Sequence, residues 1–61
     1  MKTRYHAEHN GNTVFLTEDL YTFMDFLTAE AENDRDYAES LQLFEQRGDD
    51  FYAQSLSTYE I

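Results

Sequence analysis

The sequence predicts an α+β fold in which a short N-terminal β-hairpin is followed by two or three α-helices. Three observations support it: an Asn-Gly pair near the N-terminus, apolar residues at helical spacing after residue 17, and the absence of proline from all 61 residues. A mostly α fold, a small helical bundle, is the alternative. Since a chain of this length has material for one small core, a single domain over 1–61 is expected.

The hairpin is predicted over about 3–16. Asn10-Gly11 is a strong signal for a two-residue turn, and it lies between the segments RYHAEH and NTVFL. In the first segment Tyr5 and Ala7 fall on one face of a strand, with His6 and Glu8 on the other. Because an isolated hairpin is marginally stable, it must pack against the helices.

The first helix is predicted over about 17–32. Thr17 offers a capping hydroxyl, and the acids Glu18 and Asp19 favour the positive end of the helix dipole. The apolar positions that follow lie at i, i+3, i+4, i+7 and i+11 and form one stripe that faces a core: Leu20, Phe23, Met24, Leu27 and Ala31.

Two further helices are predicted over about 34–47 and 50–59. In the first of these, Tyr37, Leu41 and Phe44 recur at helical spacing and Gly48 supplies a C-terminal cap. The second begins at Asp49 or Asp50 and carries its apolar and aromatic residues at Phe51, Tyr52, Leu56 and Tyr59.

Charge is the most unusual property of the sequence. Thirteen acidic residues against four basic ones give a formal net charge of −9, and twelve of the acids follow Leu16. Such a chain is repelled by nucleic acid and anionic lipid and attracted to basic surfaces. With no apolar stretch of about 20 residues and no apolar leader at the N-terminus, a soluble, cytoplasmic protein is expected.

Metal binding is not expected. His6 and His9 lie three residues apart, which in a strand places them on opposite faces. Asp34, Asp36 and Glu45 match positions 1, 3 and 12 of a calcium loop, but Glu39 occupies the sixth position, where the sharp turn needs glycine. A solvated turn between helices is the simpler interpretation.

Neither an enzyme nor a cofactor-binding protein is expected. The sequence has no Ser-His-Asp context, nucleophile elbow or glycine-rich phosphate loop, and thirteen acids make any single carboxylate pair uninformative. The acids have a regular arrangement instead, because Glu18, Asp25 and Glu32 follow one another at intervals of seven. Carboxylates on one helix side, about 5 to 10 Å apart, are compatible with the spacing of DNA phosphates.

In size and acidity, though in no sequence motif, the chain resembles small phage and mobile-element inhibitors of restriction enzymes, CRISPR effectors, uracil-DNA glycosylase, gyrase or nucleases. The resemblance implies a DNA mimic, a small acidic inhibitor that occupies the basic nucleic-acid-binding surface of a DNA- or RNA-handling protein. The expected charged contacts are Glu18, Asp19, Asp25, Glu32, Asp36 and Glu39. Aromatic anchors are expected at Tyr21, Phe26 and Tyr52, with Tyr59 as a further candidate.

Three alternatives remain open. An antitoxin-like or anti-sigma-like regulator would bind a protein groove through the amphipathic stripe of Leu20, Phe23, Met24 and Leu27. A homodimer or larger homo-oligomer would complete a core that is small for one chain. The acidic surface could also serve solubility alone.

Overall fold

The N-terminal hairpin is present in the computed structural model, which describes residues 2–61. Strand β1 (Thr3–His9) pairs antiparallel with β2 (Asn12–Thr17). Asn10 and Gly11 between them have φ angles of 52° and 81°, and two consecutive positive values give the turn a twist that matches the flanking strands. Ala7 pairs with Phe15 but Glu8 pairs with Thr13. Val14 is therefore the extra residue of a β-bulge in β2.

Helix α1 (Leu20–Asn33) follows β2 and confirms the predicted stripe. Phe23 and Leu27 are fully buried, and the other stripe residues, Leu20, Met24 and Ala31, pack partly buried against them. The cap is Asp19, whose carboxylate accepts a hydrogen bond from the Thr22 amide. Thr17 ends β2, and its hydroxyl accepts a hydrogen bond from the Asp19 amide.

The helices predicted over 34–47 and 50–59 are wrong, and with them the predicted fold class of a hairpin followed by helices. Only the short helix α2 (Arg35–Ser40) forms, and the chain then runs into a second hairpin of β3 (Gln42–Arg47) and β4 (Asp50–Gln54). A single 3-10 turn, η1 (Leu56–Tyr59), follows β4. Gly48, with φ of 62°, lies in the turn of this hairpin and does not cap a helix.

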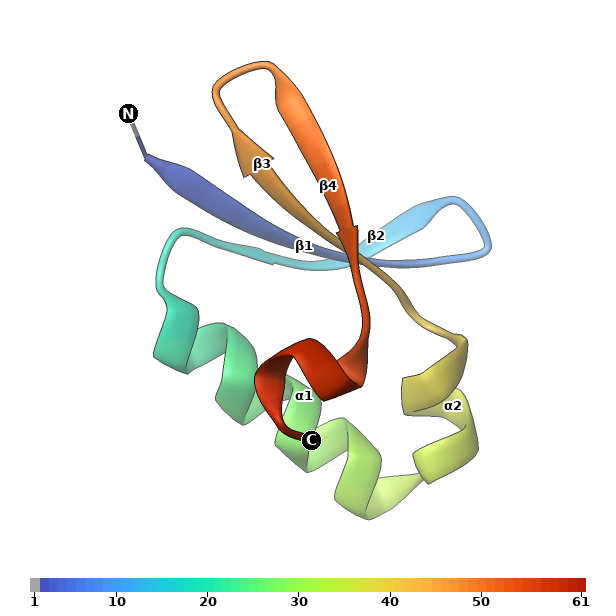
Figure 1. Ribbon diagram of the computed structural model, residues 1–61. Coiled ribbons are helices and arrows are strands. Elements are labelled where there is room, and N and C mark those ends of the chain that lie inside the picture. Colours follow the sequence, from blue (N-terminus) through green and yellow to red (C-terminus); the bar gives the residue numbers. More distant parts are fainter. Residues whose placement is uncertain (1) are drawn as a thin grey trace.

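The four strands form one antiparallel sheet in the order β2-β1-β3-β4, with β1 and β3 in the centre. Helices α1 and α2 lie on one side of the sheet, and η1 lies on the same side (Figure 1). The result is a two-layer α+β fold. Within residues 2–61, neither helix has the length and apolar character to cross a membrane.

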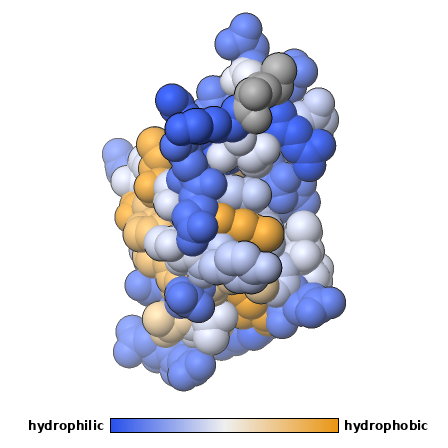
Figure 2. All heavy atoms as spheres, turned by 90° about the vertical axis from the view of Figure 1, so that its left-hand side faces the viewer, coloured by the Kyte–Doolittle hydropathy of each residue, from blue (hydrophilic) through white to orange (hydrophobic). Residues whose placement is uncertain are grey.

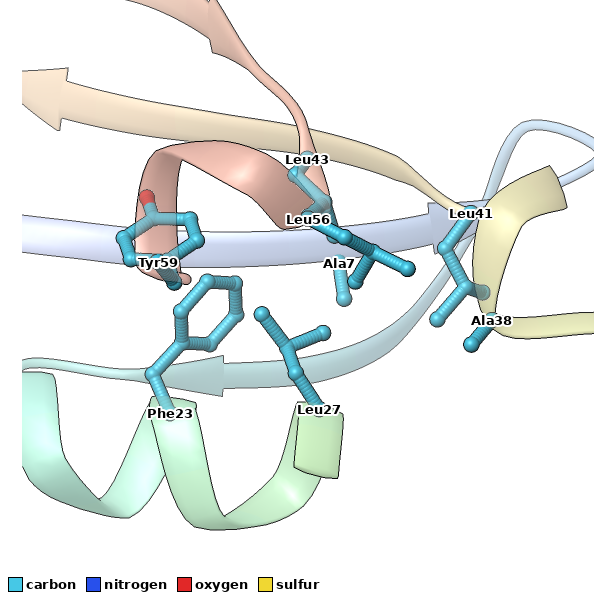
Figure 3. Packing of buried hydrophobic residues seen from close by; sticks show 8 residues of the cluster. All are labelled: Ala7, Phe23, Leu27, Ala38, Leu41, Leu43, Leu56 and Tyr59. Atoms are coloured by element: carbon cyan, nitrogen blue, oxygen red, sulfur yellow. The ribbon is translucent and has the colours of Figure 1, made fainter. Parts of the chain in front are cut away.

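The core lies between the two layers. Figure 3 shows Phe23 and Leu27 rising from α1 toward Ala7 and Leu43 of the central strands and toward Leu56 and Tyr59 of η1. Ala38 and Leu41, at the end of α2, close one side of the cluster. Aromatic contacts reinforce it, because the Phe23 ring lies 5.5 Å from that of Tyr5 and 5.4 Å, edge on, from that of Tyr59.

The opposite side of the sheet, here called the open sheet face, has no second layer within residues 2–61 (Figure 1). Successive residues of a strand point to opposite faces. Ala7 and Leu43 point into the core, so the residues directly before and after them in the chain point to the open side, and the strand register extends this assignment to β2 and β4. The residues of the open sheet face are Arg4, His6, Glu8, Thr13, Leu16, Gln42, Phe44, Gln46, Phe51 and Ala53.

Candidate protein-binding surface

An acidic stripe runs along the side of α1 that faces away from the core. At 3.6 residues per turn, Tyr21, Asp25 and Glu32 project in nearly the same direction, and all three are exposed. Asp25 and Glu32 are separated along the axis by about 10 Å, at a rise of 1.5 Å per residue. Asp36, exposed in the first turn of α2, adds a further carboxylate to the helical layer. These four residues are called the acidic helix surface.

The basic side chains do not neutralise this surface. Each of the four forms an ion pair elsewhere: Lys2 and Arg4 with Glu18, Arg35 with Glu39, and Arg47 with Glu45. Only three of the thirteen acids therefore take part in ion pairs among residues 2–61. Arg35, the one cation of the helical layer, is also held by the Ile61 carbonyl at 3.0 Å. The negative charge of α1 is left facing solvent.

The six predicted charged contacts fall into three groups. Asp25, Glu32 and Asp36 belong to the acidic helix surface. Glu18 and Glu39 are engaged in the ion pairs just described. Asp19 is the α1 cap, and its Oδ2 also accepts a hydrogen bond from the Thr22 hydroxyl at 2.6 Å. This bond, together with the one from the Thr22 amide, lowers the pKa of Asp19 from its ordinary value.

The aromatic candidates are dispersed. Tyr21 is 74% exposed and lies one turn before Asp25 on the acidic stripe. The Phe26 ring instead stacks on Phe15 at 4.3 Å and packs, partly buried, against the core, so only part of it faces solvent. Tyr52 is exposed on β4, with the Arg47 guanidinium 5.0 Å from its ring centre, and belongs to the sheet.

Tyr59 is a core residue. Its hydroxyl donates a hydrogen bond of 3.0 Å to Glu45, whose other oxygen accepts one from Arg47. Burial is the main reason that the pKa of Tyr59 lies above its usual value, and the bond to Glu45 adds to the effect. The phenol therefore stays protonated and serves to hold η1 against β3.

The metal sites considered from the sequence do not assemble. His6 contacts Phe51 on the open sheet face, whereas His9 contacts Tyr37 of α2 on the other side. Asp34 caps α2, while Glu45 lies on β3, so the supposed calcium loop is a helix and a strand. Among residues 2–61, no three His, Asp or Glu side chains gather closely enough to hold a metal ion.

A shallow hollow lies where the start of α1 meets η1, lined mainly by Tyr5, Leu20, Met24 and Tyr59. Figure 2 views the molecule from this side and shows apolar atoms at the middle and along one margin, with hydrophilic atoms above and below. Glu45 at its wall is already bonded to Tyr59 and Arg47. The hollow thus presents an apolar surface and no free acid-base pair of its own.

Comparison with known proteins assigns no family to this geometry. No family model matches the chain, and neither does any curated protein or solved structure. The function is therefore inferred from the surfaces themselves.

Proposed function

We propose that this protein is a small acidic inhibitor that binds the basic nucleic-acid-binding surface of a DNA- or RNA-handling protein through the acidic helix surface. The supporting observation is the combination on α1 of two carboxylates that form no ion pair within residues 2–61, those of Asp25 and Glu32, with the strongly exposed ring of Tyr21. Charge directs such an association, and a desolvated aromatic anchor strengthens it.

Imitation of DNA is the mechanism that this surface favours. Two carboxylates about 10 Å apart on a rigid helix can each meet a cation that otherwise contacts phosphate. The helix holds them in place before binding, which lowers the entropic cost of association. The proposal includes a cytoplasmic location, where nucleic-acid-handling partners act.

The amphipathic-helix alternative has less support. Phe23 and Leu27, the centre of the stripe that would enter a partner's groove, have no exposed surface. Binding through them would require α1 to leave the sheet and give up the core.

The experiment is a comparative capture from a lysate of the source cell. The wild-type chain is immobilised beside Asp25→Lys/Glu32→Lys and beside Asp49→Lys/Asp50→Lys, which makes the same charge change at the β3–β4 turn. The helix variant is expected to lose at least tenfold in affinity, equivalent to about 1.4 kcal/mol, while the turn variant keeps most of it.

Competition with DNA tests the mimicry itself. Duplex DNA should displace the captured protein from the wild-type chain, because both ligands would occupy one basic groove. A captured complex that still binds DNA with normal affinity would contradict mimicry. Equal losses in both charge variants would show that overall charge, and not the acidic helix surface, attracts the partner.

A further inference from the structure

A row of four side chains crosses the open sheet face, and three of the four are apolar; His6 on β1 is the polar member. Leu16 pairs with His6, His6 with Phe44, and Phe44 with Ala53. Leu16 is 50% exposed, and Phe51, beside the row, is 58% exposed. An antiparallel sheet that faces water usually presents polar residues there. An apolar row on an uncovered face indicates that something packs on it.

Side-chain contacts hold this face in a fixed arrangement. His6 Nε2 lies 2.8 Å from Gln46 Oε1, and the His6 ring lies 5.6 Å from that of Phe51. These groups come from the three strands β1, β3 and β4. A surface ordered in this way before binding loses little side-chain entropy when it is covered.

The polar residues are arranged symmetrically about the apolar row. On β1, Arg4 precedes His6 by two positions and Glu8 follows it by two, so opposite charges flank the row on the same face. On β3, Gln46 lies beside Arg4 and Gln42 lies beside Glu8. A two-fold axis along the row therefore brings Arg4 over the Glu8 position of a second copy, and Gln46 over the Gln42 position.

We propose that the open sheet face is the interface of a homodimer in which two copies pack sheet against sheet about this axis. The same patch then serves both copies, as an isologous contact requires. Each residue of the row then meets its own copy across the axis, so Leu16 and Phe44 make apolar contacts while the two His6 rings face each other. Each Arg4 meets a Glu8. Glu8 is the one acid among the strand residues that point to this face. The acidic helix surfaces lie on the two outer sides of the dimer.

The test reverses the charge at Glu8, at Arg4 and at both together, and measures the dimer dissociation constant by sedimentation equilibrium. Glu8→Arg places two cations opposite each other at both symmetry-related positions and should weaken dimerisation by at least tenfold, because close charge pairs couple strongly across interfaces. Arg4→Glu should do the same. The double exchange restores opposite charges across the axis and should recover most of the wild-type association.

Two controls keep the test specific. Asp25→Arg makes the same charge change as Glu8→Arg but on α1, and should leave dimerisation close to wild type. Because Arg4 also pairs with Glu18, Arg4→Glu can disturb folding, and circular dichroism identifies that case. In that case the comparison relies on Glu8→Arg and on the double variant that combines it with Arg4→Glu.

Three outcomes would overturn the proposal. The first is a wild-type chain that stays monomeric at the highest soluble concentration in added salt. The second is a dimer indifferent to Glu8→Arg, which would place the contact elsewhere, for example at the β4 edge. The third is a dimer weakened by the single exchange and not recovered by the double one.

Discussion

Asp19 shows how one side chain couples local structure to pH. Its carboxylate accepts two hydrogen bonds from Thr22, and the unfolded chain has neither, so the pKa of Asp19 is lower in the folded state. A lowered folded-state pKa stabilises the fold above the unfolded value, and this contribution is lost as pH falls through the folded one. The cap is thus effective at neutral pH and fails in acid.

Replacement of Asp19 by alanine should therefore destabilise the protein at neutral pH by more than it does in acid. Urea unfolding at a series of pH values measures the difference in free energy from wild type, which should shrink as the pH falls below the ordinary value of 3.8. Asp25→Ala, which removes an exposed acid from the same helix, is the matched control. A difference that does not vary with pH would contradict this account of the cap.

For Tyr59 and Phe26, the sequence alone could not distinguish a position in the core from one at the surface. Both were candidates for surface anchors, since each aromatic side chain fits a core or an interface equally well by its chemistry. Their burial depends on η1 and on the bulged strand β2, which bring Phe23 to Tyr59 and Phe15 to Phe26. Tyr21 and Phe26 both lie off the centre of the apolar stripe, and only the structure shows that Tyr21 is the exposed one.

Among the elements, the first hairpin was predicted as a hairpin and the second as helix, although both have a two-residue turn that contains glycine. Asn10-Gly11 indicated the first turn correctly. Gly48-Asp49 also separates two strands by two residues, a pattern typical of a hairpin, but Gly48 was interpreted as a helix cap. The segment LQLFEQ that precedes it is rich in helix-forming residues. Pairing with β1, which sets Leu43 beside Ala7, overrides that propensity.

The first turn should depend on Gly11 through backbone conformation alone. A Cβ at Gly11 meets no atom within 4 Å, yet its φ of +81° lies where side chains are disfavoured. Gly11→Ala should cost about 1–2 kcal/mol of unfolding free energy. Gly11→Asn should cost less, because asparagine tolerates positive φ better. Urea denaturation measures both, and an alanine variant as stable as the asparagine variant would contradict the prediction.

At the scale of the whole molecule, the acidic helix surface and the open sheet face differ in how far the sequence predicts them. The sequence revealed the excess of acids after Leu16 and the exposed side of α1, because both depend on local pattern. It did not reveal the open sheet face, because that surface combines β1 and β2 with strands that were expected to be helices. Leu16, Phe44 and Phe51 meet there only through long-range register.

Salt should affect the two proposed associations in opposite directions. Added sodium chloride should weaken binding of a basic partner, because it screens attraction between exposed charges. It should strengthen self-association, because it screens the repulsion between two chains of charge −9, while the Arg4–Glu8 contacts are sheltered in the interface. Sedimentation and partner binding measured over one salt series check this. Changes in the same direction would contradict this prediction.

The two edges of the sheet differ in a way that bears on misassembly. The β-bulge at Val14 interrupts the β2 edge, whereas β4 pairs with β3 in unbroken register from Asp50 to Gln54 and contains neither proline nor lysine. A regular edge without such features is a template for the strand of another chain. At neutral pH the net charge of −9 opposes the approach of a second chain. Protonation of the carboxylates in acid should weaken this protection and favour fibril growth through β4.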